Sequence, residues 1–157
     1  MVKFVYKWEE MVFGQQLRNL DEKNRIALPP AFKNKLVEPL YLTIGFDGQA
    51  DLRSEKEFEK FSAFLDQKNP FDAKIRQIKR QINSNTFEIT LDKQGRITIP
   101  ARIMQWIFAG EELGKEIYFV GAKDYVEIWS KSKFEALNEK VTPVGLEKLV
   151  EQAYNEK

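Results

Sequence analysis

A ten-residue stretch that occurs twice constrains the fold of this chain more than any other feature. Residues 20–29 and 91–100 both follow the pattern Leu-Asp-x-x-x-Arg-Ile-x-[Leu/Ile]-Pro. The similarity continues downstream, where residues 40–58 align with residues 116–134. Two copies of one supersecondary unit must therefore be built into the same structure.

Each copy is expected to contain two β-hairpins followed by a helix. The first hairpin of each copy turns after the motif Asp, where Gly95 and its counterpart Asn24 tolerate positive φ. Asp47-Gly48 is a strong signal for the second hairpin of the first copy, and Lys123-Asp124 occupies the equivalent turn. Helices should start after Ser54, in a capping box, and after Ser130 or Ser132. The expected strand pairs are 13–20 with 24–29, 40–46 with 49–53, 86–91 with 96–100, and 117–122 with 125–129.

The repeat sets the expected division of the chain and its fold class. Between the copies, Ile75, Ile78 and Ile82 recur at helical spacing, which predicts an amphipathic linker helix with a basic outer face. We favour a solvated role for that basic face over DNA contact. The fold class is α+β, rich in β-strands, with peripheral helices. The segments are an N-terminal extension (1–10), a first repeat (11–70), the linker helix (71–84), a second repeat (85–140) and a helical tail (141–157).

Composition excludes several classes of protein. The chain has no Cys and no His, so it forms no disulfide and cannot use serine–histidine or cysteine–histidine nucleophiles. A zinc site made of carboxylates alone is improbable, and we expect no metal, no cofactor and no enzymatic activity. No run of about 18 apolar residues or signal-peptide pattern is present, which predicts a cytoplasmic protein without membrane contact. Twelve Phe residues predict a core rich in aromatic side chains.

Charge is distributed unevenly although the net charge is only +1. Residues 15–35 hold five Lys and Arg against two acidic residues, and residues 72–102 hold seven against three. Residues 36–71 and 111–157 each have an excess of three acidic residues. Both copies are thus basic at the motif and acidic behind it, which indicates one anion-facing side.

The motif turns support two interpretations. An Asp–Arg pair could simply brace each turn. Alternatively, the turns could present Arg forks to base edges and Lys to phosphates, since a β-hairpin fits the major groove of B-DNA. The candidate DNA-binding residues are Lys23, Asn24, Arg25, Lys93, Gln94 and Arg96, and the candidate turn-bracing residues are Asp21 and Asp92.

The doubled motif resembles the MraZ family of bacterial transcriptional regulators, whose halves are each similar to AbrB-type swapped-hairpin units. The similarity covers roughly residues 11–140. Besides the doubled motif, it includes residues 11–14, 120–121 and 127–129. The resemblance implies a double swapped-hairpin barrel and assembly of identical chains into a homo-oligomeric ring. It also implies binding of double-stranded DNA at short direct repeats upstream of the division and cell-wall operon, and hence association with the nucleoid. The positions that it transfers to DNA contact are Lys23, Arg25 and Arg96.

Two function classes remain open. A regulator should carry the basic turns of both copies on one side and bind DNA in a salt-dependent way. A ring-forming scaffold would use the Asp–Arg turns only as braces.

Overall fold

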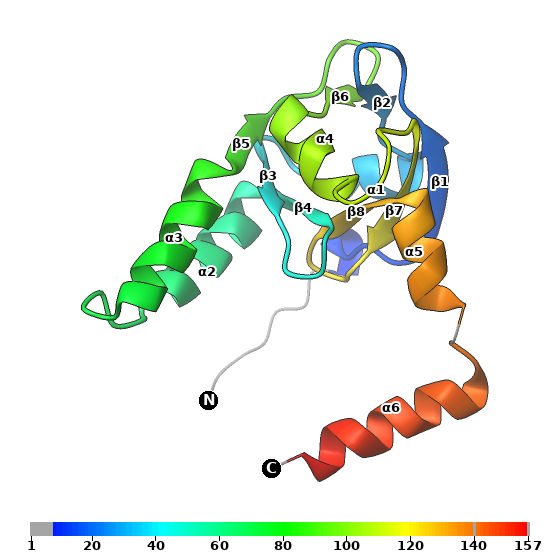
Figure 1. Ribbon diagram of the computed structural model, residues 1–157. Helices are drawn as coiled ribbons and strands as arrows, with labels where there is room; N and C mark the ends of the chain where they lie inside the picture. Colours follow the sequence, from blue (N-terminus) through cyan, green and yellow to red (C-terminus); the bar gives the residue numbers. More distant parts are fainter. Residues whose placement is uncertain (1–7, 140, 157) are drawn as a thin grey trace.

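The structure is a computed structural model that describes residues 8–139 and 141–156. Within these ranges the strands form a six-stranded sheet and a two-stranded ribbon, with helices around them, so the predicted α+β class is confirmed (Figure 1). The sheet does not close into a barrel, because β1 and β5 remain its two edges. Most of the predicted N-terminal extension lies outside the described residues. No described helix is both long and apolar enough to cross a membrane.

The elements follow the repeat along the chain. After the 3₁₀ helix η1 (Trp8–Glu10), the first copy supplies β1 (Gln15–Asn19), β2 (Arg25–Ala27), α1 (Pro30–Lys33), β3 (Leu40–Ile44), β4 (Ala50–Ser54) and α2 (Glu55–Asp66). The linker helix is α3 (Ala73–Ser84). The second copy supplies β5 (Thr86–Ile89), β6 (Arg96–Thr98), α4 (Ala101–Ile107), β7 (Glu116–Gly121), β8 (Val126–Ser130) and α5 (Lys131–Asn138), and the tail forms α6 (Pro143–Asn155).

The expectation that the two strands around each motif turn pair with each other is wrong. The turns form, but the strands on either side of each turn separate and pair with the other copy. β1 pairs with β7, β5 pairs with β3, and β2 pairs with β6. The β2–β6 ribbon places Ile26 opposite Ile97, and both side chains are buried. Pairing between the copies thus buries both motif isoleucines in one shared core.

The second hairpins form as predicted and meet at the centre of the sheet. β3 pairs with β4 and β7 pairs with β8, while β4 pairs with β8 to join the copies. Gly48 and Lys123 adopt positive φ in the two hairpin turns. Ser130 caps α5 by accepting a hydrogen bond from the Lys133 amide, whereas Ser54 precedes α2 without such a side-chain bond.

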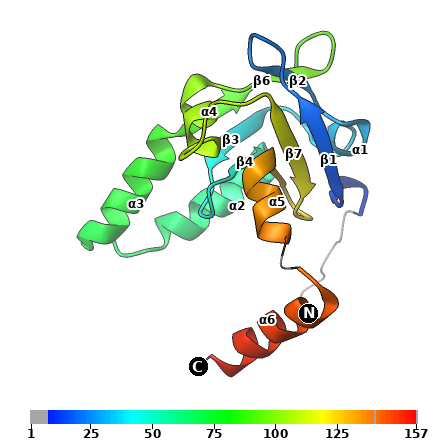
Figure 2. The same cartoon turned by 45° about the vertical axis from the view of Figure 1, so that its right-hand side comes forward.

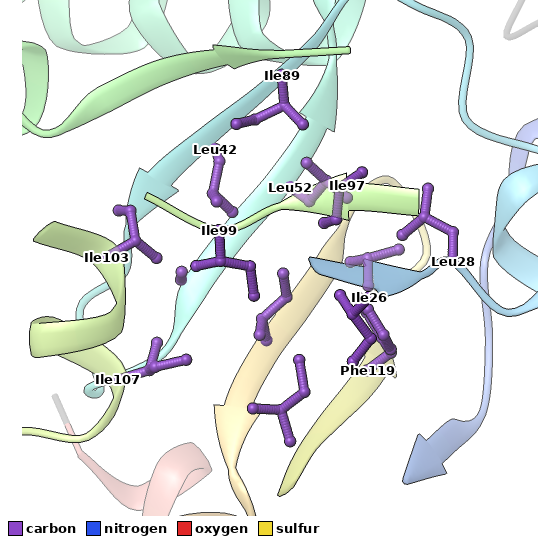
Figure 3. Packing of buried hydrophobic residues seen from close by; sticks show 14 of the residues in the cluster. Ile26, Leu28, Leu42, Leu52, Ile89, Ile97, Ile99, Ile103, Ile107 and Phe119 are labelled. Atoms are coloured by element: carbon purple, nitrogen blue, oxygen red, sulfur yellow. The ribbon is translucent and has the colours of Figure 1, made fainter. Parts of the chain in front are cut away.

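The core is aliphatic rather than aromatic, contrary to expectation. Ile and Leu side chains from the ribbon, the sheet and α4 converge on one cluster (Figure 3). Phe32, Phe108 and Phe119 join this cluster, but Phe46, Phe64 and Phe71 are exposed. Part of the aromatic surface is therefore left on the outside of the chain. The labelled core residues are Ile26, Leu28, Leu42, Leu52, Ile89, Ile97, Ile99, Ile103, Ile107 and Phe119.

Candidate nucleic-acid interface

The first motif turn is organised by the carboxylate of Asp21. Its Oδ1 accepts hydrogen bonds from the backbone N–H groups of Lys23 and Arg25, at 2.9 and 2.8 Å. Its Oδ2 accepts a bond from Nε of Arg25 at 2.7 Å. Asn24 occupies the left-handed region with φ of 58°, as the tight turn requires. One carboxylate therefore fixes both the backbone of the turn and the position of the Arg side chain.

The second turn repeats this geometry. Oδ1 of Asp92 accepts bonds from the backbone N–H groups of Gln94 and Arg96, each at 2.9 Å. Oδ2 of Asp92 accepts a bond from Nε of Arg96 at 2.8 Å. Gly95 takes the positive φ, 74°, that Asn24 takes in the first copy. Different residues between Asp and Arg thus produce the same local structure.

The hydrogen bonds keep both carboxylates ionised. The pKa of Asp21 is lowered to about 2, chiefly by the backbone N–H of Arg25 and also by its side chain. The pKa of Asp92 is lowered for the same reasons, with the backbone N–H of Arg96 as the largest cause. The Asp–Arg pairs are therefore present at any physiological pH.

The two turns lie at one end of the domain, where both views show the loops before β2 and β6 projecting from the same side (Figures 1 and 2). Nη1 of Arg96 lies 3.8 Å from Oδ2 of Asp21, which links the second turn to the first. In the ribbon, Arg25 pairs with Thr98 and Ala27 pairs with Arg96. Since alternate residues of a strand share a face, both Arg side chains belong to the face opposite the buried isoleucines.

The bracing bonds and an anion-binding role are compatible. Each Asp binds its Arg through Nε, a bond that does not use the Nη groups. The side chains of Arg25 and Arg96 remain 32% and 28% exposed. The Nη groups are the donors that an Arg side chain uses together with a second N–H in bidentate contacts to an anion or a base edge.

The other candidate residues occupy the same two turns. Lys23, Lys93 and Gln94 are exposed at the turn tips, and Asn24 is partly buried. The structure thus brings all six residues named from the sequence to one end of the molecule (Figure 1).

Two further lysines reach these turns and were missed by sequence reasoning. The Lys33 ammonium lies over Gly95, where a Cβ atom would approach it to 2.6 Å. Nζ of Lys115 donates to the backbone oxygen of Asp21 at 3.4 Å. Lys33 falls in a basic segment and could have been found from charge, but Lys115 lies in an acidic segment and only the fold reveals it.

A second polar cluster joins the copies at the centre of the sheet. Asp51 lies opposite Glu127 in the β4–β8 pair, and Nε2 of Gln49 is 3.3 Å from an oxygen of each carboxylate. The guanidinium of Arg53 lies 3.6 Å from Asp51 and stacks between the rings of Phe61 and Tyr125. The repeat aligns Asp51 with Glu127, so this pair could have been found from the sequence.

This cluster is structural in character. Asp51, Arg53 and Gln49 are each less than 8% exposed, and the aromatic rings cover the Arg53 guanidinium. Across the described ranges, no group of three or more His, Cys, Asp or Glu side chains is arranged to hold a metal ion.

The carboxyl group of Asp51 is expected to have a pKa well above that of an ordinary aspartate. Burial raises its pKa to about 6, and the charge of Glu127 adds to this while Arg53 opposes it. Because the folded chain binds this proton more tightly than the unfolded chain, the contribution of Asp51 to stability should fall as pH rises from about 4 to above 6. Carbon-detected NMR of the Asp51 carboxyl should show a midpoint near 6. Glu127→Gln should lower that midpoint, and a wild-type midpoint near 4 would contradict the burial of this group.

One protein-family model matches the two copies of the internal repeat separately. The family model described as "MraZ protein, putative antitoxin-like" matches this chain twice, over residues 11–81 and 82–156. The boundary between the two matches falls within α3.

Curated relatives are similar over most of their length. The chain is 37% identical over 126 residues to the transcriptional regulator MraZ of Mycoplasma mobile, covering 80% of this chain and 84% of that protein. It is 40% identical to the protein of the same name from Mycoplasma mycoides subsp. mycoides SC, covering 79% and 90%. A third, from Dictyoglomus thermophilum, is 34% identical, covering 82% and 85%. These relatives are named as transcriptional regulators rather than as enzymes.

Proposed function

This chain belongs to the MraZ family, and we propose that it is a sequence-specific DNA-binding transcriptional regulator without catalytic activity. The observation that carries the proposal is the pair of matched turns at one end of the domain. Each turn holds an Arg side chain by Nε and leaves it partly exposed. The DNA-binding residues would be Lys23, Asn24, Arg25, Lys93, Gln94 and Arg96, with Asp21 and Asp92 as their braces.

In this proposal the β2–β6 ribbon enters the major groove with its Arg-bearing face toward the bases. A two-stranded ribbon fits a major groove about 12 Å wide. Lys33 and Lys115, which flank the turns, would contact phosphates, so that they add affinity without sequence preference. The target would be short direct repeats in the promoter of the division and cell-wall operon, bound in the cytoplasm at the nucleoid.

The proposal also covers the fold, because the two copies exchange strands. We interpret the crossed pairing of β1, β2, β5 and β6 as a double swapped-hairpin, AbrB-like arrangement. The two repeats would comprise residues 11–70 and 85–140, joined by the linker at 71–84 and followed by the tail at 141–157.

Assembly into a ring follows from the small number of base contacts in one chain. Each matched Arg fork contributes about 1–3 kcal/mol of discrimination, whereas specific regulators typically have about 4–10 kcal/mol over non-specific DNA. Two forks reach only the lower part of that range. Several chains bound to spaced repeats would multiply the contacts through effective concentration. In a homo-oligomer with the motif turns along one rim, each subunit presents its turns in the same orientation. Such a rim would bind DNA boxes that are repeated in direct orientation.

The operator prediction can be tested with purified protein and promoter DNA. Native mass spectrometry should show an oligomer, and footprinting should show much tighter protection of DNA with several boxes than of DNA with one. Raising the salt concentration should weaken binding steeply, because phosphate contacts release counterions. A monomer at micromolar concentration, or equal affinity for one box and several, would contradict the proposal.

The alternative is a ring-forming scaffold in which the Asp–Arg pairs only brace the turns. The bonds from Arg25 and Arg96 to their Asp partners favour it as a second candidate. Such a scaffold would form the oligomer but would show no salt-dependent binding of operator DNA.

A further inference from the structure

The C-terminal helix α6 exposes an apolar face that is not covered in this chain. Leu146, Leu149, Val150 and Tyr154 follow one side of the helix at spacings of three and four residues, and each is between 47% and 84% exposed. In both views α6 projects away from the sheet (Figures 1 and 2). Thr142 caps its first turn by accepting a bond from the Gly145 amide. A well-formed amphipathic helix is thus presented with its apolar side open to water.

An apolar groove of about 250 Å³ runs beside α3 at another place on the domain. One wall is the face of α3 that carries Ile78 and Ile82, and the other is the β3–β4 turn with Phe46. Trp106 of α4 also lines the groove and donates its indole N–H to the backbone oxygen of Gln49. Ile78 and Phe46 are 42% and 73% exposed, so these apolar side chains are accessible from outside.

The charged residues that flank the two surfaces are mostly of opposite sign; the exceptions are Lys148 of α6 and Asp66 of α2, which pairs with Lys79. Helix α3 carries Lys74, Arg76, Lys79 and Arg80 and no acidic residue. Lys74 is one turn before Ile78 in the helix, and Arg80 donates to Gln77, which lines the groove. On α6, Glu147 and Glu151 lie one turn apart beside the apolar face. Acidic residues would therefore border the apolar contact on one helix and basic residues on the other.

The helices that carry the two surfaces are similar in length. Helices α6 and α3 contain 13 and 12 residues, so each is about 18–20 Å long at 1.5 Å per residue. The residues of α3 that line the groove are Gln77, Ile78, Gln81 and Ile82. A helix laid along α3 would therefore place about one to two turns of its apolar face in the groove, in the manner of helix-in-groove recognition.

We propose that α6 of one chain docks its apolar face into the groove beside α3 of a second copy of this chain. This inference rests on the homo-oligomer of the proposed function and names the contact that would join its subunits. Helix α3 and the β3–β4 turn, which contribute most of the groove lining, lie away from the loops before β2 and β6 (Figure 1). Docking therefore leaves the turns free for DNA, and it gives the basic face of α3 an acidic helix as its partner.

Cross-linking between two single-Cys variants tests the contact, because the natural chain contains no Cys. Leu149→Cys and Ile78→Cys, carried on chains of different size, should form a mixed disulfide under mild oxidation. The matched control, Lys148→Cys, places the thiol on the polar face of α6 and should give several-fold less of the mixed product. A disulfide needs Cα atoms within about 7 Å, so equal yields from the two variants would overturn the proposal.

A chain that carries both Cys substitutions distinguishes docking of α6 onto a second copy from docking onto its own chain. If Leu149→Cys/Ile78→Cys gave only monomers with an internal disulfide, even when mixed with the single-Cys chains, α6 would bind its own groove and the proposal would be wrong.

Charge reversal tests the specificity of the contact. Glu147→Lys/Glu151→Lys should reduce the oligomer seen by native mass spectrometry, and mixing with Lys74→Glu/Arg80→Glu chains should restore it. Absence of rescue would count against the charge pairing. If the cross-link formed but the protein did not bind operator DNA, the proposed function would be wrong and this contact would stand. If the protein bound operator DNA but the cross-link did not form, this contact would be wrong and the proposed function would stand.

Discussion

Replacing both Arg25 and Arg96 with Ala should abolish most discrimination between operator and random DNA. Each guanidinium is held by its Asp through Nε and remains partly exposed. One bidentate contact to a guanine is worth about 1–3 kcal/mol, or roughly 5- to 150-fold, so the double variant should lose about 2–6 kcal/mol per chain. Binding to a labelled operator and to a scrambled duplex at one salt concentration measures the difference.

Two control variants separate base contact from charge. Arg25→Lys keeps the positive charge but lacks the planar fork, so it should lose specificity while retaining binding to scrambled DNA. Lys23→Ala should weaken binding to all sequences alike and reduce the salt slope by about one. The folded state should tolerate these changes, since exposed ion pairs contribute only about 0–1 kcal/mol. Wild-type operator binding by the double variant would show that the turns are braces only.

Ile97→Ala should destabilise the fold by about 2–5 kcal/mol. Ile97 is fully buried and lies opposite Ile26 in the β2–β6 ribbon, at the place where the two copies meet. Truncation would leave a cavity lined by side chains from both copies, which the surrounding strands can fill only in part. Urea unfolding followed by circular dichroism measures the loss.

The neighbouring residue provides a matched control for this loss. Thr98 follows Ile97 in β6 but is exposed, so Thr98→Ala should change stability by no more than about 0.5 kcal/mol. Ile26→Ala should resemble Ile97→Ala, and the double variant should lose less than the sum because the two cavities are shared. Equal effects of Ile97→Ala and Thr98→Ala would contradict the described packing.

Much of the local structure could be predicted because it depends on neighbouring residues. The Asp47-Gly48 turn, the helix after Ser130 and the linker helix all follow from short-range signals, and each forms in the structure. The motif turns also form, since Asp21 and Asp92 bind backbone groups only two to four residues away.

The long-range pairing could not be predicted in the same way. Alternation along residues 86–91 identifies a strand but does not specify its partner, and the nearest strand in sequence is the wrong one. The contribution of Lys115 to the turns depends on the same long-range pairing, because β1 lies beside β7. The aliphatic core was mispredicted because a count of Phe residues does not distinguish buried rings such as Phe32 from exposed ones such as Phe71.

The exchange of strands between the copies has a consequence for how such a chain can evolve. Each half supplies strands that complete the other half, so a single copy would need a second identical copy to fill its sheet. Fusion of two copies into one chain removes the requirement that both be identical. Here the two turns already differ at every position between Asp and Arg, with Glu22, Lys23 and Asn24 in one and Lys93, Gln94 and Gly95 in the other. Duplication thus allows the two turns to diverge while their shared core is maintained.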